Sequence, residues 1–224
     1  MLEIIGMSVE DAIAIEACGA DRIELVSALT EGGLTPSYGL IEAVVKSVKI
    51  PVNVMIRHHA KSFVYSKEDI KIMEKDIEIV KSLGANGVVF GMLDQNNNID
   101  EEDLKALLAK CGGLDVTFHR AIDETNVIES MDILNKYENI TNTLTSAGKT
   151  NIRENIDVIK AMIEKSNGVN ILLGGGLNFD NIEEIKSLTK ATDFHFGTAV
   201  RVNKDPFGEI DQEKLKKLVE IINN

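Results

Sequence analysis

The sequence predicts an α/β protein of the (β/α)8 barrel type, a TIM-type barrel formed as a single domain over residues 1–224. Strand-like and helix-like segments alternate along the whole chain, which implies a parallel sheet with right-handed crossovers. The segments make eight pairs, and 224 residues divided by eight gives 28 residues for each pair. That number of units matches a closed barrel.

The second argument for closure is polar residues on one face of several strand candidates. Val116 and Phe118 alternate with Thr117 and His119. Successive side chains of a strand point to opposite faces. A doubly wound open sheet, the competing architecture, makes its central strands apolar on both faces. The interior of a small barrel can instead hold polar groups near its mouth, so the alternation favours the barrel.

Each element has its own local signal. Ser8 with Asp11, and Ser66 with Asp69, have the spacing of a capping box at a helix start. Pro36 suits the first turn of a helix, where its missing N–H costs nothing. The predicted strands are Leu2–Ile5, Arg22–Val26, Val52–Ile56, Gly87–Met92, Asp115–His119, Asn142–Thr145, Asn170–Leu173 and Asp193–Gly197. The predicted helices are Ser8–Gly19, one beginning at Thr35–Pro36, Ser66–Gly84, Asp100–Lys110, Asn126–Tyr137, Asn151–Lys165, Asn178–Thr189 and Asp211–Ile222.

Composition narrows the function classes. The formal net charge is −12, and the sequence pI is about 4.8. Such acidity argues against a nucleic-acid partner or an anionic membrane surface. No apolar run approaches the roughly 20 residues of a membrane helix, and no signal peptide is visible at Met1–Gly6. Two cysteines form no disulfide framework, so we expect a cytoplasmic, reduced protein.

The active site of such a barrel lies at the carboxyl ends of its strands. Helix N-termini and Arg57 make that face locally cationic, which suits a small anionic or highly hydroxylated ligand. The catalytic candidates there are Glu24, Arg57, His119, His195 and Asp123, and the polar candidates for ligand binding are Ser27, Thr145 and Ser146. In this hypothesis Arg57 binds the anion, His119 acts as acid or base after a modest pKa adjustment, and Glu24 orients either residue or is the base. Alternatively, Glu24 and Arg57 neutralise each other in a salt bridge.

Glycine-rich loops follow the seventh and eighth predicted strands. Many barrels bind phosphate between these two loops. We therefore expect Gly175, Gly176, Gly197 and Thr198 to bind a phosphate or carboxylate, although a tight turn alone explains the glycines equally well. The loop Ser27–Thr35 is either a lid over the mouth or a plain connector.

Metal binding is a further alternative. Glu24, His119 and His195 together could hold a divalent cation with open coordination positions. Copper(I) prefers thiolate and thioether ligands, but Cys18 and Cys111 belong to the opposite end of the barrel and have no metal-binding spacing. The adjacent histidines His58 and His59 are expected to be exposed to solvent, with a metal role less favoured.

The longest specific motifs are Arg22–Leu25 (RIEL), Ser27–Ser37 (SALTEGGLTPS), Ile50–Arg57 (IPVNVMIR), Phe63–Ser66 (FVYS), Gly87–Gly91 (GVVFG) and Val116–Ala121 (VTFHRA). Together with Leu144–Ser146 and Gly174–Gly176, they resemble the signature of the copper homeostasis protein CutC family over essentially the whole chain. The resemblance implies a (β/α)8 barrel, a cytosolic location and a role in copper homeostasis, with copper as a candidate ligand. Glu24, Arg57 and His119 match the family pattern.

Two positions depart from that pattern. Val26 stands where the family often has cysteine, and His58–Lys61 replaces the family's frequent Pro-Arg-Gly-Gly after Arg57. Three hypotheses follow: a copper-handling protein, an enzyme acting on a small anionic, phosphorylated or sugar-like substrate, and a non-catalytic binding barrel. We expect a homodimer, although no interface can be predicted.

Overall fold

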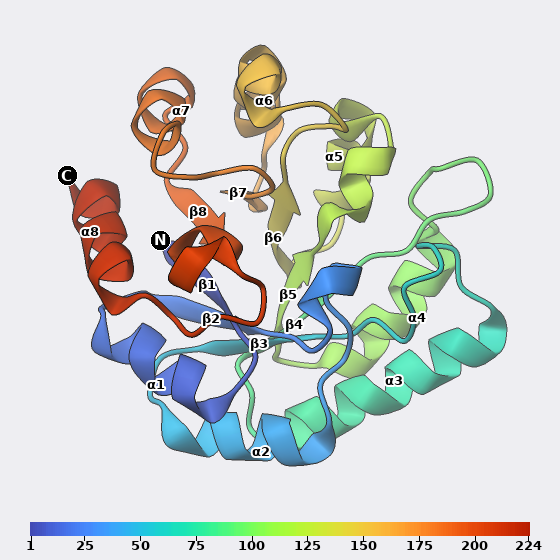
Figure 1. Ribbon diagram of the computed structural model, residues 1–224. Coiled ribbons are helices and arrows are strands. Elements are labelled where there is room, and N and C mark those ends of the chain that lie inside the picture. Colours follow the sequence, from blue (N-terminus) through green and yellow to red (C-terminus); the bar gives the residue numbers. More distant parts are fainter.

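The chain forms a closed barrel of eight parallel strands, in sequence order around the ring, in which β8 pairs with β1. The computed structural model describes residues 1–224, and Figure 1 shows the strands enclosed by helices. The strands are β1 (Leu2–Gly6), β2 (Arg22–Leu25), β3 (Val52–Met55), β4 (Gly87–Phe90), β5 (Asp115–Phe118), β6 (Ile140–Thr145), β7 (Asn170–Leu173) and β8 (Asp193–Phe196). The predicted fold class is therefore confirmed.

A helix follows each strand and packs on the outside of the ring (Figure 1). The helices are α1 (Val9–Ala17), α2 (Tyr38–Ser47), α3 (Lys67–Ser82), α4 (Glu101–Cys111), α5 (Val127–Leu134), α6 (Ile156–Lys165), α7 (Ile182–Thr189) and α8 (Gln212–Asn223). None of them has the length and apolar character needed to cross a membrane.

The main hydrophobic core lies between the ring of strands and the helices. It contains the outward-facing residue of each alternating pair, for example Ile4, Val54 and Phe118. The inward face carries a small apolar layer of Ile5, Val26, Met55 and Val89, and polar residues fill much of the remaining interior. The alternation in the sequence thus separates a hydrophobic core outside the ring of strands from a largely polar barrel interior.

Some predicted helix boundaries are wrong. α2 begins at Tyr38 with Ser37 as its cap, because the Ser37 hydroxyl accepts the Leu40 N–H. Thr35 instead contacts the segment after β3, because its hydroxyl accepts the Arg57 N–H at 2.9 Å. The segment predicted as the helix 151–165 is a 3-10 turn, Ile152–Asn155, followed by α6.

The predicted capping box at Ser8 forms only in part. The Ser8 hydroxyl accepts the Asp11 N–H at 3.0 Å, but the Asp11 carboxylate accepts a bond from Arg201 at 2.7 Å. Arg201 is almost fully buried and follows β8. Asp11 therefore joins the first helix to the loop after the last strand, which closes the ring on the mouth side.

Candidate functional site

A single cavity of about 580 Å³ opens at the carboxyl end of the barrel. It is lined by Glu24, Arg57, His119 and His195, which follow or end four different strands. Closing the ring therefore brings together four of the five catalytic candidates. The predicted anion-binding residues Gly175, Gly176, Gly197 and Thr198 also line this cavity.

One side of the cavity floor is acidic. The His195 imidazole lies between two carboxylates: Nδ1 is 2.8 Å from Glu3 Oε1, and Nε2 is 3.7 Å from Glu24 Oε2. All three side chains are buried, and one ligand atom from each lies within 4.8 Å of the others. Glu24 Oε1 has no hydrogen-bond partner. Glu24 and His195 face the cavity, whereas Glu3 lies behind His195 and orients its ring.

Glu3, Glu24 and His195 shift one another's pKa values. Burial raises the pKa of Glu24 to about 7, against the opposing effect of His195. Burial alone would lower the pKa of His195, but Glu24 and Glu3 raise it above its ordinary value. Burial would also raise the pKa of Glu3, but Arg22 and His195 hold it below its ordinary value. Glu24 therefore has a pKa near neutrality and lies beside a histidine whose pKa is raised.

Glu3 and Arg22 are site-supporting residues that the sequence argument missed. Arg22 Nε donates to Glu3 Oε2 at 2.6 Å, and its Nη1 donates to Asn142 Oδ1 at 3.1 Å. The available signal was the alternation of Glu3 with Leu2 and Ile4, which places a carboxylate on the inward face of β1. Of the residues predicted to hold a cation, Glu24 and His195 lie together with Glu3, whereas His119 lies outside this group.

Arg57 and His119, at the ends of β3 and β5, present hydrogen-bond donors at the cavity. Arg57 Nη1 donates to the backbone oxygens of Glu31 at 2.7 Å and Gly33 at 3.2 Å. The buried Arg57 Nε has no partner, and no carboxylate pairs with the guanidinium. The predicted alternative of a salt bridge between Glu24 and Arg57 is therefore wrong. The Ser27–Thr35 loop is also fixed in place by these bonds and by the pairing of Ser27 with Leu34.

His119 is a neutral donor rather than a proton-transfer group. Its Nδ1 accepts the Ala121 N–H at 3.2 Å, so the neutral ring carries its proton on Nε2, which is buried without a partner. Burial lowers the pKa of His119 to about 3, and the positive charge of Arg57 adds to this effect. The expected modest pKa adjustment is wrong, and Glu24 does not orient this ring. Gly91 makes room for it, because a Cβ there would lie 2.5 Å from His119 Nδ1.

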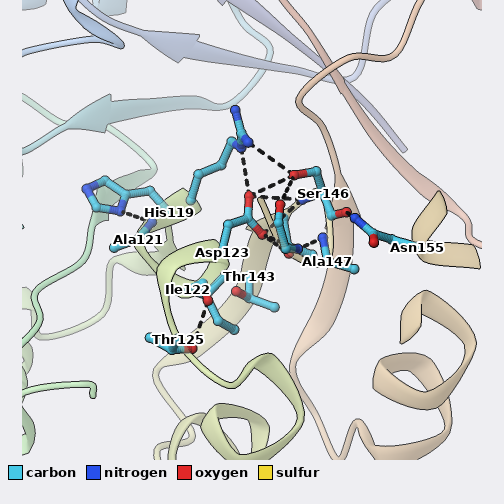
Figure 2. Close-up of polar contacts among 12 residues, drawn as sticks. His119, Ala121, Ile122, Asp123, Thr125, Thr143, Ser146, Ala147 and Asn155 are labelled. Atoms are coloured by element: carbon cyan, nitrogen blue, oxygen red, sulfur yellow. Dashed lines mark hydrogen bonds and ion pairs between the residues drawn. The ribbon is translucent and has the colours of Figure 1, made fainter. Parts of the chain in front are cut away.

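Asp123, Thr145 and Ser146 form a structural cluster outside the cavity lining. Asp123 accepts bonds from the Thr145 hydroxyl, from the N–H and hydroxyl of Ser146, from the Gly148 N–H and from Arg120. Figure 2 shows the Asp123 and His119 side chains pointing in different directions. These carboxylate oxygens are occupied by protein donors, so the structure places Asp123, Thr145 and Ser146 in a network that fixes the loop after β6 and does not bring them to the cavity with the other candidates.

Ser27 is likewise a loop residue. Its hydroxyl donates to the Leu34 and Thr35 carbonyls, at 3.2 and 3.0 Å, and it does not line the cavity. The structure therefore does not bring Ser27 together with the other candidates for ligand binding.

The two glycine-rich loops present unpaired backbone donors. The N–H groups of residues 175–177 and 197–199 donate to no protein acceptor. Gly175 has a positive φ of 82°, and a Cβ at this position would lie 2.6 Å from the Arg120 guanidinium carbon. Glycine is therefore required there by both backbone conformation and the close approach of Arg120.

The remaining metal candidates do not fit copper(I). The Cys18 and Cys111 thiols are buried against the backbone oxygens of Gln212 and Leu107, at the ends of α1 and α4 away from the mouth. Burial raises the pKa of Cys111 to about 12. His59 is half-buried against Tyr65, so its expected exposure is wrong, and both His58 and His59 turn toward Asp69.

The fold and the site define a (β/α)8 barrel with a polar, partly acidic cavity at its carboxyl mouth. The family model of the CutC family matches residues 1–200. The chain is 41% identical over 200 residues to a human relative named copper homeostasis protein cutC homolog, covering 87% of this chain and 72% of that protein. It is 40% identical to the mouse protein of the same name. The chain belongs to the CutC family.

Solved structures agree with this assignment. A CutC protein from Streptococcus agalactiae superposes with a TM-score of 0.83 at 33% identity, covering 88% of this chain and 97% of that one. Phosphoribosyl anthranilate isomerase from Thermotoga maritima superposes with a TM-score of 0.69 at 15% identity, covering 99% and 98%. At that identity the second likeness shows the barrel fold alone.

Proposed function

We propose that this chain acts in copper homeostasis, the role stated in the names of its human and mouse relatives, and that it binds the metal at the barrel mouth through Glu24 and His195. One observation carries the site assignment: a buried carboxylate oxygen of Glu24 lacks any partner beside an imidazole nitrogen that faces the same cavity. A cation accepts electron pairs from both atoms and removes the cost of burying the unpaired oxygen.

The donor set determines which form of copper fits. Carboxylate oxygen and imidazole nitrogen suit divalent copper and other divalent ions, whereas copper(I) prefers sulfur. Glu3 supports the site because a metal-binding histidine ordinarily donates its other ring N–H to a carboxylate. His195 Nδ1 has that partner at 2.8 Å. Cavity space beyond the two side chains is left for water or a second ligand.

The test is an equilibrium titration with Cu(II), and separately with Cu(I), each against a competing chelator. We expect Cu(II) binding by the unaltered protein and at least about 10-fold weaker binding in Glu24→Gln, which removes one charged ligand. The matched control is a Cys18→Ser, Cys111→Ser double variant, which should bind Cu(II) unchanged. Loss of binding in the cysteine variant, or full binding in Glu24→Gln, would contradict the assignment.

The cytosolic location and the homodimer that we expected belong to the same proposal. An acidic chain of this composition fits the cytosol. Light scattering coupled to size exclusion tests the dimer: a mass near the monomer's 24.6 kDa would exclude it.

The alternative of an enzyme acting on a small anionic substrate receives no support from the names of the relatives. Binding of a small anion at the mouth does not depend on catalysis.

A further inference from the structure

We propose that Arg57 and His119 form a binding site for an oxyanion, the carboxylate or phosphate group of a small molecule that enters the barrel mouth. This site lies at the ends of β3 and β5 and uses neither Glu24 nor His195. The oxyanion site can therefore be tested independently of the metal site.

Two buried donors without acceptors carry the proposal. Arg57 is 7% exposed and His119 is 3% exposed, and both line the cavity. Arg57 Nε and His119 Nε2 have no hydrogen-bond partner. Burying a donor without an acceptor is costly, and nearly all buried polar groups in folded proteins have a hydrogen-bond partner. A ligand oxygen in the cavity supplies the acceptor that the protein lacks.

Phe63 contacts both donor side chains, which come from the ends of β3 and β5. The Arg57 guanidinium carbon lies 5.0 Å from the centre of the Phe63 ring, and the His119 ring centre lies 4.9 Å from it. This shared aromatic contact restricts both side chains, and the two backbone carbonyls on Arg57 Nη1 restrict the guanidinium further. The donors are thus positioned before a ligand arrives, which lowers the entropic cost of binding.

The charges around the donors favour an anion. Arg57 is a buried positive charge whose hydrogen bonds go to backbone oxygens and not to a carboxylate, an arrangement that is costly until an anion approaches. Lys204 lines the same cavity and adds positive charge, whereas the charge of Arg120 is paired with Asp123. Arg57 can offer parallel N–H groups that match the geometry of a carboxylate or phosphate.

His119 adds discrimination. Its Nδ1 is occupied by the Ala121 N–H, so Nε2 can only donate in the neutral ring. A low pKa of about 3 keeps the ring in this neutral form throughout the physiological range. The site therefore requires an acceptor and rejects a ligand group that can only donate. A volume of about 580 Å³ restricts the ligand to a small metabolite.

The experiment is an NMR titration of the metal-free protein, in the presence of a chelator, with inorganic phosphate and separately with malonate. The reporters are the Arg57 Nε–H signal and the His119 ring signals. We expect saturable shifts of both reporters with at least one probe. Arg57→Gln and His119→Phe should weaken binding at least about 10-fold, which corresponds to about 1.4 kcal/mol.

His119→Phe keeps an aromatic ring against Phe63 and leaves the carbonyl contacts of Arg57 untouched. It therefore tests the site even if Arg57→Gln disturbs the Ser27–Thr35 loop. Arg153→Gln is the matched control, because Arg153 pairs with Glu184 on the surface. Shifts with phosphate alone or with malonate alone would support the site and identify the group it selects. The absence of saturable shifts with either probe, or unweakened binding in a folded His119→Phe protein, would overturn it. Neither negative result changes the prediction for copper at Glu24 and His195.

Discussion

Replacing Glu24 by glutamine should stabilise the barrel at neutral and alkaline pH. The side chain is almost fully buried, one carboxylate oxygen has no partner, and the other lies 3.7 Å from His195 Nε2. Glutamine has nearly the same shape and carries no charge. The substitution therefore removes the cost of ionising a buried group while leaving the packing of the mouth in place.

The magnitude follows from the pKa. Burial raises the pKa of Glu24 from an ordinary 4.5 to about 7. Between these values the folded protein holds a proton that the unfolded chain has released, so the free energy of unfolding falls as the pH rises. At about 1.4 kcal/mol per pH unit, the loss amounts to about 3 kcal/mol and is complete above about pH 7. Glutamine abolishes this loss, and weakened pairing with His195 offsets part of the gain.

Urea denaturation with a chelator present measures the effect. We expect similar unfolding midpoints for the two proteins near pH 5 and a higher midpoint for Glu24→Gln near pH 8. Glu220→Gln, a change on the exposed surface of α8, should leave the pH dependence unaltered. If Glu24→Gln is the less stable protein at pH 8, or follows the same pH profile as the unaltered chain, the carboxylate is not held in an unfavourable charged state.

Three further predictions concern other parts of the mouth. Gly91→Ala places a Cβ 2.5 Å from His119 Nδ1. The substitution should therefore lower the free energy of unfolding in urea by about 1–3 kcal/mol and weaken oxyanion binding. Unchanged values for both would show that the His119 ring is free to move. Asp123→Asn should lower the free energy of unfolding by about 1–3 kcal/mol, because it weakens the hydrogen bonds to the loop after β6. Its Cu(II) affinity should be unchanged, and a large loss of that affinity would show that Asp123 belongs to the metal site. Cu(II) affinity should rise with pH through about 7, because the metal displaces the proton from Glu24, and a flat calorimetric profile between about pH 6 and 8 would contradict this.

The alternation of residues along the strands was enough to predict the barrel and most of its mouth. Phe118 and His119, one residue apart, lie on opposite sides of the sheet as the period of two requires. Ring closure then determines that the ends of β2, β3, β5 and β8 share one cavity. No pairing information was needed, since strictly alternating strands and helices leave sequential neighbours as the simplest order.

The expectations from sequence differ from the structure where a side chain contacts residues that are distant along the chain. Asp123 follows a strand as a catalytic carboxylate would, but it turns to the hydroxyls and N–H groups of the next loop. Glu3 has an unremarkable place in a short apolar strand, and only the distant Arg22 and His195 give it a role. The pKa of His119 depends on burial and on the charge of Arg57, neither of which is visible along the chain.

The location of bound copper is the most direct test of the account. Crystals soaked with Cu(II) and measured at the copper absorption edge should give an anomalous peak at the floor of the barrel mouth, in contact with Glu24 and His195. Such a peak should be absent from crystals of Glu24→Gln. A peak at Cys18 or Cys111, or at His58 and His59 on the rim with the floor of the mouth empty, would contradict the account.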